Sequence, residues 1–139
     1  MNLYSYKSLK SWQKSIELTH EIYRLTRLLP KEELFGLSSQ MRKAAVSIPS
    51  NIAEGQDRNS KKEFIMFLGI ARGSRAELET QLYICVGEGF ITSKEAEKAN
   101  ELLGEIGGLI TGHIRKLKSE ILFQSQPKTD NGQPKTDNG

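Results

Sequence analysis

The sequence predicts an all-α protein, with its 139 residues arranged as an antiparallel four-helix bundle. Three observations predict this fold class. Apolar residues recur at the spacing of an amphipathic helix, two capping boxes mark helix starts, and prolines and glycines stand where helices should stop. We expect helices near residues 9–28, 34–54, 61–86 and 93–122, in one domain (residues 1–124) that is followed by a tail (residues 125–139).

The first predicted helix, residues 9–28, has a wide apolar face opposite a charged one. The apolar face holds Leu9, Trp12, Ile16, Leu18, Ile22, Tyr23 and Leu25, and the opposite face holds Lys10, Lys14, Glu17, Glu21 and Arg24. Pro30 should end this helix, because the residue before a proline is pushed out of the helical region. Trp12, the only tryptophan, is more typical of a core or subunit contact than of a base-stacking platform.

The second predicted helix begins near Glu33–Phe35 and carries a proline within its apolar pattern. That pattern is formed by Met41, Ala44, Ala45, Ile48 and Ile52. Pro49 inside it would cost about 3 kcal/mol in a straight helix. We therefore expect a kink at Ser47–Pro49, with two short abutting helices as the alternative. Gly55 is expected to end the helix in a left-handed conformation.

The third predicted helix has a clear start and a clear end. Ser60 is followed three residues later by Glu63, which is the pattern of a capping box. Gly87 and Gly89 should stop the helix before Phe90, because glycine adopts the conformations that end helices.

The fourth predicted helix starts at a second capping box, Thr92 with Glu95. Its apolar stripe consists of Ala99, Leu102, Leu103, Ile106, Leu109, Ile110, Ile114 and Leu117. The same helix contains four glycines, Gly104, Gly107, Gly108 and Gly112, each about 1 kcal/mol less favourable than alanine. They indicate close backbone approach, within the bundle or between subunits; the alternative is a weak segment held in place by packing.

The last fourteen residues, 126–139, consist of QPKTDNG written twice. They contain no large apolar group whose burial could offset the entropy of ordering, so the tail should be disordered. A duplicated coding segment without a role and a binding segment both fit this pattern.

Composition indicates a soluble, cytoplasmic chain without a membrane span. Apolar residues make up 37% and charged residues 27% of the sequence. The single cysteine, Cys85, excludes an internal disulfide framework and fits a reducing compartment. No segment has the length and apolar character of a signal peptide or of a transmembrane helix.

Charge is distributed unevenly although the net charge is only +3. Residues 1–76 hold 13 Lys and Arg against 7 Asp and Glu, whereas residues 77–124 hold 5 against 8. Such asymmetry indicates a basic surface suited to nucleic acid or to an acidic partner. An ordinary solvated surface of mixed sign is the alternative.

No catalytic or metal-binding constellation is visible, and we expect a non-enzyme without a cofactor. The segment Ala71–Ser74, ARGS, lies in mid-helix and lacks the ending of a phosphate-binding loop. His20 and His113 are isolated and lack metal-ligand spacing. Glu77 and Glu79 point to different faces of a helix.

The second and third helices should form a hairpin that brings basic residues together. If the hairpin is centred near Asp57–Arg58, residues whose numbers add up to about 115 face each other. Lys43 then faces Arg72, and Gln40 faces Arg75. Like charges at this distance need acidic partners or an anionic ligand, and Arg and Lys fit phosphate geometry. Glu77 and Glu79 are the candidate internal partners. The candidate nucleic-acid-binding residues are Arg42, Lys43, Arg58, Lys61, Lys62, Arg72 and Arg75.

Several segments resemble a bacterial family of four-helix-bundle proteins first found encoded in intervening sequences of large-subunit rRNA. The resemblance rests on the opening YKSLKSWQKSIEL, on LPKEELFGLSSQ, RKAAVSIPSNIAEG and R-x-S-x-KEF, and on FLGIARGS and ELETQL, and it covers roughly residues 4–122. It implies a small antiparallel bundle that assembles as a barrel-like homopentamer. A similar relative, the accessory protein of diversity-generating retroelements, binds nucleic acid beside a reverse transcriptase.

The sequence therefore leaves three interpretations of function. In the first interpretation, the chain is a non-enzymatic oligomer that binds the RNA or DNA backbone without reading bases. Alternatively it is a protein-interaction scaffold for a nucleic-acid enzyme such as a reverse transcriptase. The third interpretation is a mobile-element remnant with no essential ligand.

Overall fold

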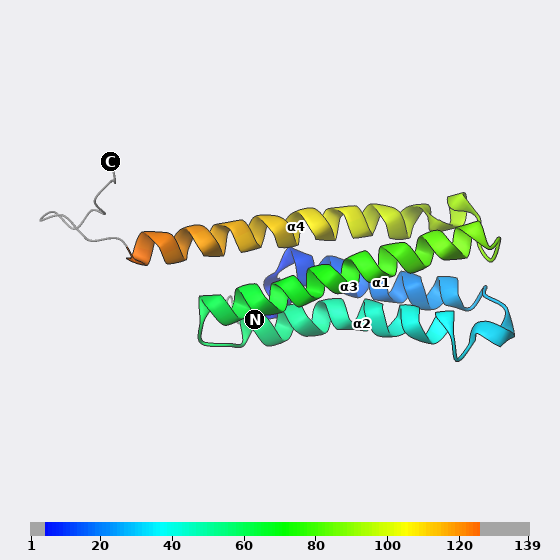
Figure 1. Cartoon of the computed structure of the whole chain (residues 1–139), viewed down its shortest axis with the longest axis horizontal. Helices are drawn as coiled ribbons and strands as arrows, with labels where there is room; N and C mark the ends of the chain where they lie inside the picture. Colours follow the sequence, from blue (N-terminus) through cyan, green and yellow to red (C-terminus); the bar gives the residue numbers. More distant parts are fainter. Residues whose placement is uncertain (1–4, 126–139) are drawn as a thin grey trace, which may run out of the picture.

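The computed structural model describes residues 5–125, which fold into four long helices joined by short connections (Figure 1). The elements in chain order are the 3-10 turn η1 (Tyr6–Ser8), α1 (Lys10–Thr26), the 3-10 turn η2 (Lys31–Glu33), α2 (Leu37–Gln56), α3 (Lys61–Gly87) and α4 (Ser93–Ser125). No strand occurs in this part of the chain. The predicted all-α fold with four helices is confirmed.

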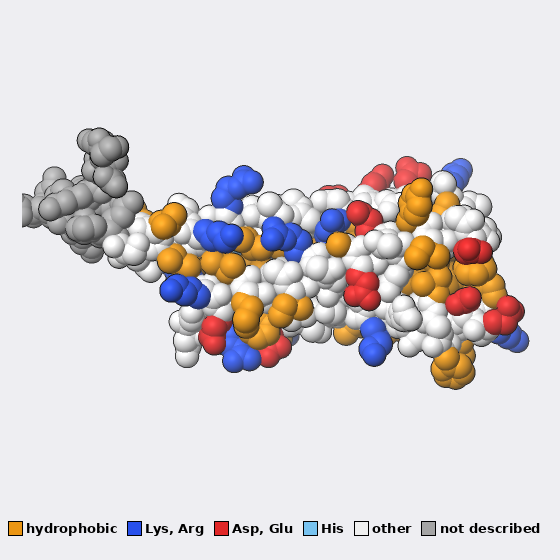
Figure 2. Space-filling view, viewed as in Figure 1, with side chains coloured by type: hydrophobic (Ala, Val, Ile, Leu, Met, Phe, Trp, Pro, Cys, Tyr) orange, Lys and Arg blue, Asp and Glu red, His pale blue; other side chains and the backbone are white. Residues whose placement is uncertain are grey.

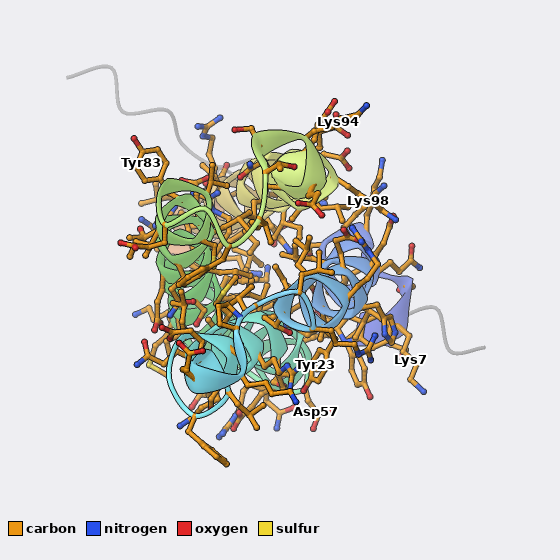
Figure 3. All side chains as sticks on the ribbon, turned by 90° about the vertical axis from the view of Figure 1, so that its right-hand side faces the viewer. Lys7, Tyr23, Asp57, Tyr83, Lys94 and Lys98 are labelled. Carbon is orange, nitrogen blue, oxygen red and sulfur yellow. The ribbon has the colours of Figure 1, made fainter. Side chains whose placement is uncertain are left out.

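The helices run up and down, and each packs against two neighbours. Helix α1 packs against α2 and α4, and α3 packs against α2 and α4. Viewed along the bundle, the four helices therefore occupy the corners of a square, with α1 diagonal to α3 (Figure 3). The predicted tail lies outside the described residues, apart from Ser125, which is the last residue of α4.

All four helices contribute large side chains to the core. The largest fully buried side chains are Leu18, Ile22 and Leu25 of α1, Met41, Ile48 and Ile52 of α2, Leu68, Leu78 and Leu82 of α3, and Leu103, Ile106 and Ile110 of α4. Burial of one such side chain contributes about 1.5–3 kcal/mol to folding. Trp12 is half-buried and packs against this core, as its place on the apolar face of α1 predicts.

The predicted capping box at the start of α4 is complete, and at the start of α3 the N-cap hydrogen bond of the predicted box is present. The Ser60 hydroxyl accepts a hydrogen bond of 3.3 Å from the backbone N–H of Glu63. At the start of α4 the bonds are reciprocal, because the Glu95 N–H donates to Thr92 Oγ1 (3.0 Å) and the Thr92 N–H donates to Glu95 Oε1 (2.9 Å). Gly89 has φ +74°, the left-handed conformation expected after α3.

Three boundary predictions need correction. Helix α1 ends at Thr26, two residues before residue 28. Helix α2 begins at Leu37 rather than near Glu33–Phe35, because residues 31–33 form a separate 3-10 turn. Pro49 lies within one helix, so the alternative of two abutting helices is wrong.

Gly55 does not end α2, contrary to the prediction. It lies inside the helix, is buried, and has no positive φ. A Cβ atom at this position would lie 2.7 Å from Phe67 Cβ and 2.9 Å from Phe64 Cδ1. Glycine is therefore needed for the close packing of α2 against α3, rather than for backbone freedom.

Between residues 5 and 125, no helix combines the length and apolar character needed to span a membrane.

Candidate nucleic-acid interface

The contacts between α2 and α3 define a different register from the expected one. The hydroxyl oxygens of Ser47 and Ser74 lie 2.8 Å apart, and Cys85 Sγ lies 3.4 Å from Met41 Sδ. Between these two contacts Lys43 lies level with α3 residues that follow Ser74, so it does not face Arg72. The predicted level of four basic residues on the hairpin is therefore not formed.

Arg42 and Lys43 lie on the side of the bundle formed by α1 and α2. Arg42 Nε donates a hydrogen bond of 2.9 Å to Thr26 Oγ1, and its guanidinium carbon lies 5.0 Å from the centroid of the Tyr23 ring. Both basic residues line a hollow together with the exposed Phe35. Arg42 is thus engaged in a contact between α1 and α2.

The basic residues at the α2–α3 turn are partly engaged by acidic neighbours. Arg58 forms a salt bridge of 2.9 Å with Glu54 Oε1. Lys61 Nζ lies 3.2 Å from Glu120 Oε2 on α4. Lys62 is exposed and has no ion pair within the described residues. The turn therefore offers less free positive charge than its sequence indicates.

Arg72 and Arg75 come together with basic residues of α4 that the sequence analysis missed. Two adjoining hollows run along the line where α3 meets α4 and share Arg72 and Thr111. We call them the α3–α4 groove. Its lining consists of Arg72, Arg75, Gly104, Gly107, Gly108, Thr111, Ile114, Arg115, Lys118, Ser119 and Leu122. It holds four basic side chains and no acidic one.

Figure 2 shows how these charges lie on the surface. Lys and Arg side chains gather along the boundary of α3 and α4, in the half of the bundle that contains the end of α4. Hydrophobic side chains lie among them, and acidic side chains near this boundary lie mainly towards the other half. The groove is therefore a positively charged strip with apolar neighbours.

The basic residues of the groove differ in the hydrogen bonds and ion pairs that they form within the protein. Arg75 Nη1 donates to Glu79 Oε2 (3.1 Å) and to the Leu103 carbonyl (3.2 Å), whereas its buried Nε has no partner among the described residues. Arg72 Nη1 lies 3.5 Å from Thr111 Oγ1, a long contact. Glu79 is thus the predicted internal partner of Arg75, while Glu77 accepts a hydrogen bond from Gln81 instead.

Arg115 and Lys118 are exposed and form no ion pair within residues 5–125. The sequence carries a signal for them, the segment RKLK at residues 115–118, which places three basic residues within four positions. Counting charge over all of residues 77–124 conceals it, because seven of the eight acidic residues of that range lie before residue 106. A helical wheel of α4 places residues 104, 108, 111, 115 and 118 on one side.

The glycines of α4 have two different environments. At Gly107 an added Cβ would lie 3.0 Å from Arg75 Nε, so the Arg75 side chain lies close against the α4 backbone there. At Gly104, Gly108 and Gly112 an added Cβ would have nothing within 4 Å. Close approach within the bundle, one of the predicted explanations, therefore applies to Gly107 alone.

His113 lies near the α2–α3 turn and faces Phe64, with the two ring centroids 4.8 Å apart in an edge-to-face arrangement. Burial, followed by the positive charge of Lys116, holds the pKa of His113 below its ordinary value. In the described part of the chain, no group of three His, Cys, Asp or Glu side chains could hold a metal ion.

Comparison with known proteins places this arrangement in a family. The family described as "23S rRNA-intervening sequence protein" matches residues 7–112. A crystal structure of a protein with unknown function from the S23 ribosomal protein family of Bacteroides thetaiotaomicron is similar, with 30% sequence identity and a TM-score of 0.70. The match covers 76% of this chain and 95% of that one. The comparison with curated proteins gives no match. The chain belongs to the 23S rRNA-intervening sequence protein family.

Proposed function

We propose that this chain is a non-enzymatic, cytoplasmic, oligomeric bundle protein that binds the phosphate backbone of nucleic acid along the α3–α4 groove. One observation carries the proposal: the two adjoining hollows of this groove are lined by four basic side chains from two helices and by no acidic residue. Arg and Lys fit phosphate oxygens, and contacts of this kind position a nucleic acid without reading its sequence.

The distribution of charge favours this groove over the two other basic regions. Arg42 is held by α1, and Arg58 and Lys61 are paired with glutamates. In the groove Arg115 and Lys118 have no ion pair within residues 5–125, so phosphate contacts there displace no internal partner. Arg75 is paired with Glu79, so three basic residues of the groove, Arg72, Arg115 and Lys118, support affinity in the range of non-specific binders, at about 10⁻⁴–10⁻⁶ M near physiological salt.

Exposed apolar side chains support the proposed oligomer. Phe35 is 92% and Tyr83 is 82% exposed, and Tyr83 projects from α3 into solvent (Figure 3). Met66 and Ile70 are also exposed on α3. Apolar surface of this kind is typical of interaction sites, whereas Phe64 is buried and cannot contribute. A homopentamer, as the resemblance implies, would repeat the groove and add weak contacts through avidity.

The test is fluorescence anisotropy with labelled RNA and DNA at low and near-physiological salt. We expect the variant Arg72→Glu/Arg115→Glu/Lys118→Glu to lose binding. The logarithm of the affinity of the wild type should fall with the logarithm of salt concentration by about 0.7–0.9 per phosphate contact. Absence of binding by the wild type at low salt would refute the proposal.

A matched control keeps the same change in net charge. Lys7, Lys94 and Lys98 are exposed and project from the bundle away from the α3–α4 groove (Figure 3). The variant Lys7→Glu/Lys94→Glu/Lys98→Glu should keep most of the binding. The turn variant Arg58→Glu/Lys61→Glu/Lys62→Glu should lose less than the groove variant. If all three variants lose binding equally, overall charge rather than the groove is responsible.

A scaffold for a nucleic-acid enzyme is the second candidate, and Phe35 supports it. An aromatic side chain 92% exposed beside a hollow lined by Tyr23, Leu34 and Val46 resembles the aromatic anchors of protein interfaces. In this case Phe35→Ser should abolish complex formation with a reverse transcriptase in analytical ultracentrifugation and leave nucleic-acid binding unchanged. An unchanged complex would exclude this anchor.

A further inference from the structure

We infer that the α3–α4 groove takes a single nucleic-acid strand in preference to a duplex, with the sugar-phosphate backbone lying over the main chain of α4 at Gly104 and Gly108. This inference rests on the proposed function. It goes further by naming the form of nucleic acid and the part of the groove that contacts it.

The first step concerns two glycines that the fold itself does not require. Gly104 and Gly108 are exposed, line the groove, and would accept a Cβ atom without any contact within 4 Å. Each costs the helix about 1 kcal/mol relative to alanine. Gly107 between them is different, because Arg75 occupies the space above it. The bundle therefore gives no packing reason for the two open glycines.

The second step is the position of these glycines beside positive charge. Gly104 and Gly108 are one helical turn apart, about 6 Å along α4. Arg72 and Arg75 lie on the α3 side of the same hollow, and Arg115 and Lys118 continue the groove towards the end of α4. A position without a side chain lets another backbone approach a helix closely. A phosphodiester chain that lies against α4 here has Arg72 and Arg75 on its α3 side and Arg115 and Lys118 farther along its path.

The third step concerns the size of the groove. A double helix, whose major groove alone is about 12 Å wide and about 8.5 Å deep, is large beside the two hollows that form the groove. The two hollows have volumes of about 380 Å³ and 440 Å³, the size range of sites that hold small molecules. One strand fits such a groove, whereas a duplex would touch only its rim.

The fourth step concerns the polar and apolar groups between the charges. Leu122 is 64% exposed and lines the same hollow as Arg115 and Lys118. Thr111 and Ser119 add hydroxyl groups there. The bases of a single strand present free faces and edges to such groups, whereas in a duplex they are stacked and paired. A basic groove with apolar side chains among its charges is the usual composition of single-strand sites.

The experiment compares single-stranded and duplex oligonucleotides of one sequence and length, in RNA and in DNA, by anisotropy at matched low salt. The variant Gly104→Leu/Gly108→Leu fills the floor of the groove. The control Gly73→Leu/Gly112→Leu changes two open glycines on the same pair of helices that do not line the groove. Thermal unfolding of each protein is measured in parallel.

We expect the wild type to bind the single strand about tenfold more tightly than the duplex, a difference of about 1.4 kcal/mol. The groove-filling variant should lose about tenfold in single-strand affinity without a lower melting temperature, because leucine favours helix more than glycine does. The control should bind like the wild type.

The outcomes separate this inference from the proposed function. Equal affinity for both forms, with charge reversal abolishing both, would overturn the single-strand inference and leave the proposed function intact. Loss of affinity in the glycine control equal to that in the groove variant would overturn the role of Gly104 and Gly108. Absence of binding to either form at low salt would remove the proposed function, and the inference with it.

Discussion

The guanidinium group of Arg75 on α3 lies directly over the main chain of α4 at Gly107. A Cβ atom added at Gly107 would lie 3.0 Å from Arg75 Nε and 3.2 Å from Cδ and Cζ. The side chain cannot easily move aside, because Glu79 and the Leu103 carbonyl hold its Nη1. This contact places the Arg75 side chain between α3 and α4, in the α3–α4 groove.

The contact predicts that alanine has different effects on stability at the neighbouring positions Gly107 and Gly108. Gly108→Ala should raise the free energy of unfolding by about 1 kcal/mol, because alanine favours helix and nothing obstructs it. Gly107→Ala should raise the free energy of unfolding by less than Gly108→Ala does, or lower it, since crowding in a packed interface costs about 1–3 kcal/mol. Urea unfolding measures both values.

A double-mutant cycle identifies the cause. In an Arg75→Ala background the space over Gly107 is open, so Gly107→Ala should then stabilise the protein about as much as Gly108→Ala does, about 1 kcal/mol. If Gly107→Ala remains unfavourable without the Arg75 side chain, the contact with Arg75 is not its cause.

A second prediction concerns Gly55, where α2 and α3 pack closely. Gly55→Ala should destabilise the protein by about 1–3 kcal/mol, because the new methyl group would lie 2.7 Å from Phe67 Cβ, an atom that moves only with its backbone. Gly73→Ala is the control, since that position is open. Urea unfolding that shows equal stability of the Gly55→Ala variant and the wild type would contradict the close approach.

Gly55 also illustrates which features the sequence could predict. Helix number, core faces and the N-cap residues Ser60 and Thr92 follow from local patterns, because they depend on residues within one or two turns. Gly55 has the same local pattern whether it ends a helix or allows another helix to pack against it. Only the position of Phe64 and Phe67 on α3 distinguishes the two cases.

The candidate site was less predictable, because it depends on how helices align. A hairpin centred on the turn places Lys43 opposite Arg72, but the Ser47–Ser74 contact shifts α3 relative to α2. Arg72 instead reaches Thr111 of α4 and lines the same hollow as Arg115. The local periodicity of α3 and α4 does not show that these two helices pack against each other. The groove between them could therefore be identified only from the structure.

The third prediction concerns the thiol of Cys85. It is fully buried against Met41, and burial, followed by the negative charge of Glu33, raises its pKa to about 11. Because the thiolate is the reactive form, a thiol reagent at neutral pH should label the folded protein only through unfolding. The labelling rate should therefore rise with urea concentration in parallel with the unfolded fraction. Rapid labelling in the absence of urea would contradict the burial of Cys85.

The last prediction concerns the dependence of stability on pH. The pKa of His113 in the folded protein lies below the ordinary value of 6.5, first because of burial and second because of Lys116, with Glu120 acting in the opposite direction. Well above that pH, His113 is neutral in both the folded and the unfolded chain and contributes no pH dependence. As pH falls through 6.5, the unfolded chain takes up the proton first, so the free energy of unfolding decreases until the lower folded pKa is reached.

His113→Gln tests this linkage, because glutamine cannot take up the proton. We expect the wild type to lose more stability than this variant between about pH 7.5 and about pH 5.5, the range in which histidine titrates. Urea unfolding at closely spaced pH values measures the difference. Parallel curves for the wild type and His113→Gln would show that His113 is solvated as in the unfolded chain, and that its edge-to-face contact with Phe64 does not exclude water.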